Sequence, residues 1–322
     1  MATSAASRRS PLRFCLLVFA LSLPFWLAGA IAERRGFQPG FPMNLPVSAL
    51  MAVCPLLAAV ILVHRAEGSA GVRRLLRRVL DYRRIGRQRW WVAIVLLNPT
   101  ILVGCYGVMR LLGRPLPEPH LSLAAAPLLL LVFLPPAVGE EAGWMGYAAD
   151  PLQDRWGALR AGLLLGTVGA LWHVVPLVQA HHGPAWIAWK CLETLAARVL
   201  IVWLYNNTGR SLFAAVLFHA LSNVGVSLFP NGGSHYEPAV AAVLTGVAAG
   251  IVTFLWGART LARFRPGLTR PGPSAAPGAL EVDARHPPGV TPESLLNPAT
   301  RDPAPERPPR CGWPRRACRG CG

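Results

Sequence analysis

The sequence predicts an all-α fold, a membrane-embedded bundle of about eight transmembrane helices. Of its 322 residues, 53% are hydrophobic and 15% are charged, a composition that is atypical of soluble globular proteins. Apolar segments about 20 residues long recur along the chain, and this is the length that a helix needs to cross a hydrocarbon core about 30 Å thick. They are rich in Leu, Ala and Val and lack period-two alternation, so a helical bundle is favoured over an outer-membrane barrel.

Eight segments have the length and composition of a span. The first three and the eighth carry no Asp, Glu, Lys or Arg. The fourth contains two adjacent glutamates, the fifth and seventh each contain a histidine, and the sixth contains three charged residues. In chain order, the predicted spans are 14–32, 45–63, 90–109, 121–147, 160–178, 184–204, 211–229 and 238–257.

The basic residues are placed as in a multi-pass membrane protein. The formal net charge is +17, and nine arginines lie between Arg65 and Arg89, in the second connection. Other basic residues cluster before the first span and after the eighth. By the positive-inside rule we expect a cell-membrane protein with both termini in the cytoplasm, which an even number of spans also requires. The lipid bilayer is then the partner of these cations, and no nucleic acid is expected.

Two segments outside the predicted spans have compositions that predict how each is organised. Residues 70–89 carry apolar side chains at helical spacing with arginines on the other face, which predicts an interfacial amphipathic helix; a solvated basic loop is the alternative. The membrane domain is expected over 1–265, and the Pro- and Arg-rich segment 266–322 is expected to be a disordered cytoplasmic tail. Its Cys311, Cys318 and Cys321 lack a fourth nearby ligand, so a zinc site there is weakly supported.

Ionisable side chains inside a bilayer are costly and usually mark function. Candidates for a site are the tandem Glu140 and Glu141, then His173, and then His219 with Asn223, which lie one turn apart on one helix face. A carboxylate can activate water or hold a metal, imidazoles can ligate or transfer protons, and an amide can stabilise an oxyanion. These types therefore suggest a hydrolytic site, although each residue alone could serve helix packing.

The depths of these residues in the bilayer agree only in part. At 1.5 Å per residue, Glu140 lies about 10 Å above the cytoplasmic end of a span that ends near Tyr147, and His219 lies about 12 Å into its own span. His173 lies about 20 Å into a helix that begins near Arg160, and is therefore expected to be deeper.

Three other charged residues lie in the sixth span. Lys190 and Glu193 are three residues apart, and we expect an internal salt bridge between them. Arg198 lies near the predicted cytoplasmic end of the span, at a depth comparable with that of Glu140.

The segment from about 138 to 223 resembles the CPBP family of intramembrane proteases, which includes CAAX prenyl endopeptidases and bacterial Abi or bacteriocin-immunity proteins. The family's Glu-Glu-x-x-x-Arg motif is matched in "EEAGWMGY" from Glu140, except that Met145 stands in place of Arg. The Phe-x-x-x-His motif is matched at His173, with Gly169 in place of Phe, and His-x-x-x-Asn is matched in full by "HALSN" from His219.

The resemblance implies that Glu140 activates water with help from His173, and that His219 and Asn223 bind metal or stabilise the oxyanion. Whether a divalent metal such as Zn2+ is used stays open; His173 and His219 would be its ligands. Loss of the motif arginine at Met145 removes the expected counter-charge of the glutamate pair, and Arg198 is a candidate substitute.

The functional expectation is an endopeptidase that hydrolyses a peptide bond of a membrane-associated peptide or protein near the cytoplasmic leaflet. Two alternatives remain. One is a catalytically degenerate member acting as a membrane scaffold, binding or immunity protein, which the departures at Met145 and Gly169 favour. The other is a proton-coupled transporter that uses the Glu and His residues as a relay, although no internal repeat is evident.

Overall fold

The computed structural model describes residues 9–37, 39–118 and 124–262, and within these ranges the chain is helical with no strand. The all-α prediction is confirmed. The predicted tail, 266–322, and its three cysteines lie outside the described residues. The elements are α1 (Pro11–Arg34), η2 (Pro42–Asn44), η3 (Val47–Val53), α2 (Cys54–Arg78), η4 (Tyr82–Ile85), α3 (Gln88–Leu111), α4 (Ala125–Gly143), η5 (Trp144–Ala149), α5 (Asp150–Trp156), α6 (Ala158–Gln179), α7 (Pro184–Asn207), α8 (Leu212–Leu228) and α9 (Pro238–Trp256).

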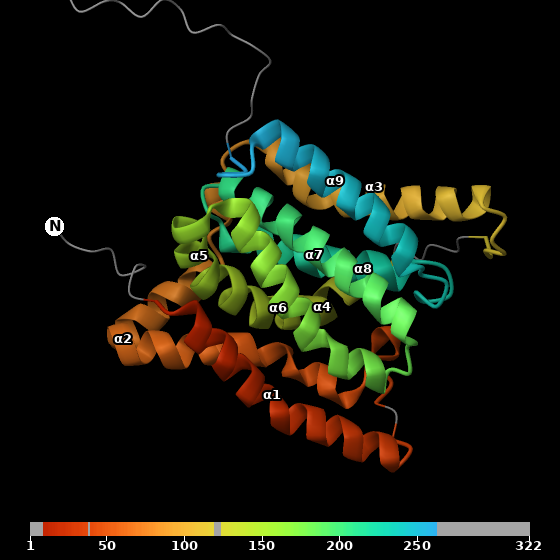
Figure 1. Cartoon of the computed structure of the whole chain (residues 1–322), viewed down its shortest axis with the longest axis horizontal. Helices are drawn as coiled ribbons and strands as arrows, with labels where there is room; N and C mark the ends of the chain where they lie inside the picture. Colours follow the sequence, from red (N-terminus) through yellow and green to blue (C-terminus); the bar gives the residue numbers. More distant parts are fainter. Residues whose placement is uncertain (1–8, 38, 119–123, 263–322) are drawn as a thin grey trace, which may run out of the picture. The chain divides into compact units, whose positions relative to one another are not determined.

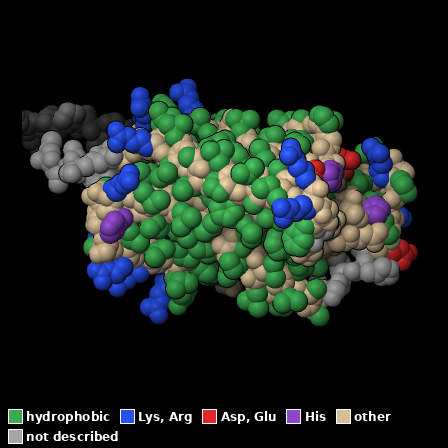
Figure 2. Space-filling view, turned by 90° about the horizontal axis from the view of Figure 1, so that it is seen from below, with side chains coloured by type: hydrophobic (Ala, Val, Ile, Leu, Met, Phe, Trp, Pro, Cys, Tyr) green, Lys and Arg blue, Asp and Glu red, His purple; other side chains and the backbone are tan. Residues whose placement is uncertain are grey.

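Each of the eight predicted spans corresponds to a helix, and successive long helices run back and forth through the bundle (Figure 1). Within the described residues, six helical segments are long and apolar enough to cross a membrane. The other two are α7, which carries Lys190, Glu193 and Arg198, and α8, which has 17 residues. Hydrophobic side chains cover the middle of the face in Figure 2, and basic side chains gather toward its ends. This is the surface of a multi-pass membrane protein.

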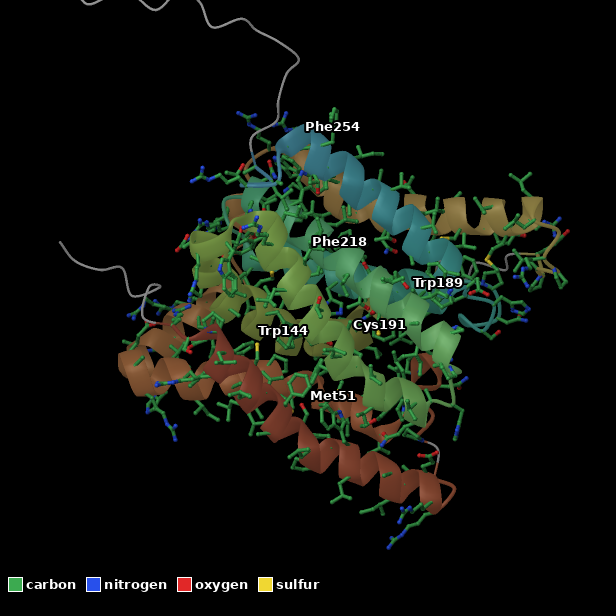
Figure 3. The ribbon with its side chains drawn as sticks, viewed as in Figure 1. Met51, Trp144, Trp189, Cys191, Phe218 and Phe254 are labelled. Carbon is green, nitrogen blue, oxygen red and sulfur yellow. The ribbon has the colours of Figure 1, made fainter. Side chains whose placement is uncertain are left out.

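Aromatic residues occupy both the interior and the outer surface of the bundle. Figure 3 shows Trp144 inside the helices and Phe254 projecting from the outer side of α9. Trp144 is fully buried, whereas Phe254 is 82% exposed. Large exposed apolar side chains of this kind are the contact surface expected toward lipid.

The helix that begins with α4 is longer than its predicted span. After Gly143 the backbone passes through a π-helical turn, Trp144–Ala149, and continues as α5 to Trp156. The prediction that this span ends near Tyr147 was therefore wrong. The polar Asp150 in this continuation is paired, because Tyr205 and Arg210 contact its carboxylate.

The amphipathic segment 70–89 is also organised differently from the prediction. Helix α2 is bent at Gly68, which has a φ of 63°, and it ends at Arg78; the short 3-10 turn η4 follows. Leu75 from the predicted apolar face is buried in the bundle, whereas Leu80 is 70% exposed. One continuous interfacial helix to residue 89 is therefore not formed.

Two glycines let α4 approach its neighbours closely. Gly139 and Gly143 flank the glutamate pair in a Gly-x-x-x-Gly spacing that is typical of close helix packing in membranes. A Cβ at Gly139 would lie 2.5 Å from the carbonyl oxygen of Ala52, and one at Gly143 would lie 2.5 Å from that of Pro55. The helix with the glutamates thus packs backbone to backbone against η3 and the start of α2.

Gly143→Leu is expected to lower the free energy of unfolding by about 3 kcal/mol, because overpacking at a backbone contact forces α4 away from α2. The matched control is Gly250→Leu on α9, where an added Cβ would have open space. Thermal unfolding in detergent should show a lowered Tm for the first variant only. Equal shifts in the two variants would contradict the close-packing argument.

Candidate active site

Glu140 and Glu141 lie in the last turn of α4 and are both buried, with 6% and 0% of their surface exposed. Consecutive side chains on a helix point in different directions, about 100° apart. Each glutamate therefore makes its ion-pair contacts with different helices.

Glu141 is held by α7 and α8. Its Oε2 lies 2.6 Å from Nη1 of Arg198, and its Oε1 lies 2.8 Å from Nδ1 of His219. An ionised carboxylate only accepts hydrogen bonds, so His219 donates through Nδ1 and its Nε2 is left for other chemistry. The candidate counter-charge Arg198 thus contacts Glu141, where the buried Met145 supplies no charge.

Glu140 faces α6. Its Oε1 lies 3.8 Å from Nε2 of His173, beyond hydrogen-bonding distance but short enough for a shared water. Nδ1 of His173 lies 2.8 Å from the carbonyl oxygen of Gly169, which can only accept, so Nδ1 carries a proton. In the neutral ring Nε2 then presents its lone pair toward Glu140. The His173 side chain is 36% exposed, so this side of the site is open.

The depth difference expected between His173 and Glu140 does not occur. Glu140 lies 16 residues before Trp156, where the helical segment ends, and His173 lies 15 residues after Ala158, where α6 begins. Because α5 and α6 meet at Gly157, equal distances from this corner place the two side chains at the same level. The mismatch arose from ending the fourth span too early.

An aromatic contact joins η5, which continues α4, to α6 beside these groups. Trp144, in the matched motif, packs edge-to-face on Trp172 with ring centroids 5.8 Å apart. Trp172 is the neighbour of His173, and its Nε1 donates a hydrogen bond to Ser22 of α1. The tryptophan of the motif therefore fixes the distance between the helices that carry Glu140 and His173.

Asn223 lies one turn beyond His219 on α8 and is half-buried. Among the described residues, no hydrogen bond joins its amide to either glutamate. The start of α8 is fixed by Asp81, which accepts hydrogen bonds from Ser211 Oγ and from the backbone N–H of Phe213. Asp81 thereby sets the height of the helix that presents His219 and Asn223.

The expected salt bridge between Lys190 and Glu193 is confirmed at 2.9 Å. Lys190 also lies over the ring of Tyr236, with its Nζ 5.0 Å from the ring centroid. These contacts are on the first half of α7, and no hydrogen bond or ion pair in the described part of the chain joins them to Glu140 or Glu141.

Two arginines near the site were not singled out from the sequence. Arg9 and Arg78 both donate to the carbonyl oxygen of Gly146, at 3.1 and 3.2 Å. This carbonyl lies in the π-helical turn directly after the glutamates. Arg78 is one of the arginines of the second connection, which the positive-inside rule already explains. Nothing in the sequence around Arg78 therefore indicated a contact with Gly146.

The described donors around Glu140 and Glu141 do not make up a three-ligand zinc site. Within the ranges that the structure describes, no group of three or more His, Cys, Asp or Glu side chains is placed to hold a metal. His173 and His219 each use Nδ1 in a contact with Gly169 or Glu141, which leaves Nε2 free, as in metal-bound histidines. Catalytic zinc in proteins is usually held by three side chains.

Comparisons with known proteins agree with the motifs. Residues 122–225 match the family model described as type II CAAX prenyl endopeptidase Rce1-like. The chain is 25% identical over 237 residues to CAAX prenyl protease 2 of Methanococcus maripaludis, an alignment that covers 68% of this chain and 84% of that protein. With the three motifs in order on α4, α6 and α8, these matches make the chain similar to CAAX prenyl endopeptidases over the segment that carries the candidate site.

Proposed function

We propose that this protein is a CAAX-type intramembrane endopeptidase that cleaves a membrane-associated peptide or protein by glutamate-activated water. The observation that carries the proposal is the pairing of Glu140 Oε1 with His173 Nε2 at 3.8 Å, beside a glutamate that is already neutralised by Arg198. The family matches support the peptidase class. Arg198 also supplies the cation that Met145 lacks, which weakens the case for a degenerate, non-catalytic member.

Glu140 is the general base in this mechanism. A water between Glu140 and His173 would donate one proton to the carboxylate and a hydrogen bond to Nε2 of the imidazole. Its oxygen attacks the carbonyl carbon of the scissile bond while the proton passes to Glu140. Burial of the carboxylate excludes competing solvent and strengthens its interaction with this water.

His219 and Asn223 are proposed to stabilise the oxyanion. Glu141 orients His219 through Nδ1, so that a proton on Nε2 can be donated to the developing charge, and Asn223 offers its amide N–H one turn away. When the tetrahedral intermediate collapses, the C–N bond breaks and the amine takes the proton held by Glu140. Glu141 and Arg198 act as positioning residues.

The proposed orientation has both termini in the cytoplasm, because the connections rich in arginine then face the cytoplasm. His219 lies seven residues into α8, which begins on this side, whereas Glu140 and His173 lie 16 and 15 residues from the corner of α5 and α6. The scissile bond would therefore have to reach into the bilayer from the cytoplasmic side.

Proteolysis by the purified protein in liposomes tests this proposal, with a library of membrane peptides as substrate. We expect cleavage that persists after treatment with a strong chelator, because the side chains that the structure describes form no three-ligand metal site. Loss of cleavage on chelation, with recovery on adding Zn2+, would contradict the glutamate mechanism. Absence of cleavage by a folded protein would contradict the enzyme itself.

A further inference from the structure

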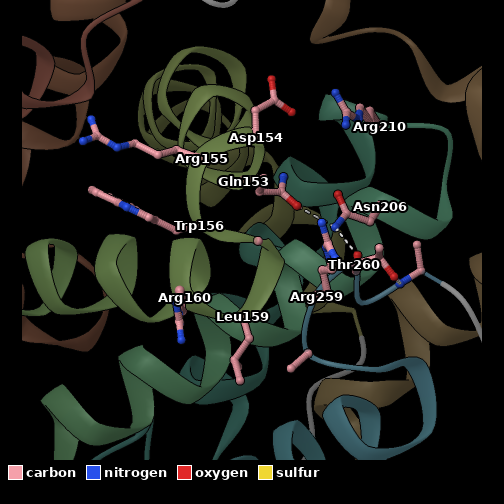
Figure 4. A pocket seen from close by; sticks show the side chains of 13 residues that line it. Gln153, Asp154, Arg155, Trp156, Leu159, Arg160, Asn206, Arg210, Arg259 and Thr260 are labelled. Atoms are coloured by element: carbon pink, nitrogen blue, oxygen red, sulfur yellow. Dashed lines mark hydrogen bonds between the residues drawn. The ribbon is translucent and has the colours of Figure 1, made fainter.

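A cavity of about 920 Å³ lies away from the glutamates, at the corner where α5 meets α6 and where α7 and α9 end (Figure 4). None of the candidate catalytic residues lines it. Its volume is in the range of small-molecule sites in proteins. The proteolytic mechanism makes no use of this space.

Its charged lining is mainly cationic. Arg155, Arg160, Arg210 and Arg259 line the cavity, with Asp154 as the acidic side chain among its lining residues. Arg160 and Arg259 are exposed and form no ion pair within the described residues. Arg210 is paired with Asp150 at 3.4 Å, so Arg160 and Arg259 are the cations that an anion in the cavity would neutralise.

A fixed amide lies beside these arginines. Oε1 of Gln153 accepts a hydrogen bond of 2.7 Å from Asn206, which in turn donates to the backbone carbonyl of Thr260. This pairing sets the orientation of the Gln153 amide and ties α5, α7 and the segment after α9 together around the cavity. The donors that can reach a ligand there are the guanidiniums.

The remaining wall is apolar. Trp156 is 42% exposed beside the cavity, with Leu159 also in the lining. The cavity lies at helix ends, which in a membrane protein lie at the bilayer interface. Tryptophan is enriched at this level, where ligands have a polar head and an apolar body.

We propose that this cavity binds a phosphate-bearing anion, the headgroup of an anionic phospholipid in the leaflet next to the arginine-rich connections. The guanidiniums of Arg160 and Arg259 would hold the phosphate, and Trp156 would contact the glycerol and the first part of the acyl chains. A free phosphate shares the charge of this ligand but has no apolar part that could contact the apolar wall.

Binding is measured on the full-length protein in neutral detergent, as the shift of Tm with ligand concentration. The ligands are dioctanoyl phosphatidylglycerol, dioctanoyl phosphatidylcholine and inorganic phosphate. We expect a saturable rise in Tm with phosphatidylglycerol and little change with phosphatidylcholine. The double variant Arg160→Gln/Arg259→Gln should weaken the apparent affinity by about tenfold or more, because two charge-assisted contacts are lost.

The matched control is Arg73→Gln/Arg77→Gln, which removes two exposed arginines of α2 that do not line the cavity. It should leave the phosphatidylglycerol response unchanged. An equal loss in both double variants would mean diffuse attraction and would overturn the proposal, as would no selective response in the wild type. A saturable response to inorganic phosphate that equals the lipid response would support the anion site but assign it to a soluble ligand. The Tm shift does not depend on proteolysis, so this experiment tests the lipid site separately from the proposed peptidase activity.

Discussion

Glu140→Gln is expected to reduce cleavage of a membrane peptide by about 100- to 10,000-fold, the contribution typical of a general base. The amide cannot take a proton from water, whereas its size and shape are those of the carboxyl group. The measurement is the rate of cleavage by purified protein in liposomes, at a substrate concentration that saturates the wild type.

The same substitution should leave the Tm nearly unchanged. Glu140 is buried, and its ion-pair contact in the described structure is His173 at 3.8 Å, so a neutral side chain leaves no closely paired cation behind. Glu193→Gln is the matched control, because it removes a partly buried carboxylate of α7 that the mechanism does not use. It should keep the activity of the wild type.

Two results would contradict the assignment of the base. One is a Glu140→Gln protein that keeps most of its activity. The other is a Glu141→Gln protein that is as stable as the wild type and wholly inactive. If Glu141 is a positioning residue, loss of its ion pair with Arg198 should lower the Tm. The second result would move the base from Glu140 to its neighbour.

The residue types of the site could be predicted from the sequence because polar groups are rare in apolar segments. Glu140, His173 and His219 stand out against Leu, Ala and Val, and their spacing matches a family motif. Their partners could not be assigned in this way. The sequence placed Arg198 at the depth of the glutamate pair, but it did not distinguish Glu140 from Glu141, because this depends on how α4 is rotated against α7.

Backbone features were harder to predict than side-chain chemistry. The π-helical turn after Gly143 has no signature in an apolar pattern, and the apolar run alone does not show that the helix continues past Tyr147 to Trp156. The polar Asp150 in this continuation is paired with Tyr205 and Arg210, and neither pairing can be read from the sequence. The contact of Arg78 with Gly146 could not be predicted either, because Arg78 is one of nine arginines in the same connection and composition does not distinguish them.

Arg198→Ala is expected to lower the free energy of unfolding by about 3 to 5 kcal/mol, the cost of leaving one partner of a buried ion pair unpaired. Arg198 is 5% exposed and Glu141 is fully buried, so water cannot replace the guanidinium. Cleavage should fall as well, because Glu141 orients His219. Arg198→Lys keeps the charge and should lose less stability than Arg198→Ala. Unfolding in detergent and the cleavage rate are measured together.

Met145→Arg in the Arg198→Ala background separates a counter-charge role from simple loss of packing. Met145 is buried and lies four residues after Glu141, the spacing of neighbouring side chains on a helix, so an arginine there would place a cation near the carboxylate. We expect this double variant to regain part of the lost stability and cleavage. In the wild-type background, Met145→Arg adds a second buried cation and should be destabilising. Arg198→Ala with unchanged Tm and activity would show that Glu141 needs no counter-charge, and the site would then have to be explained without one.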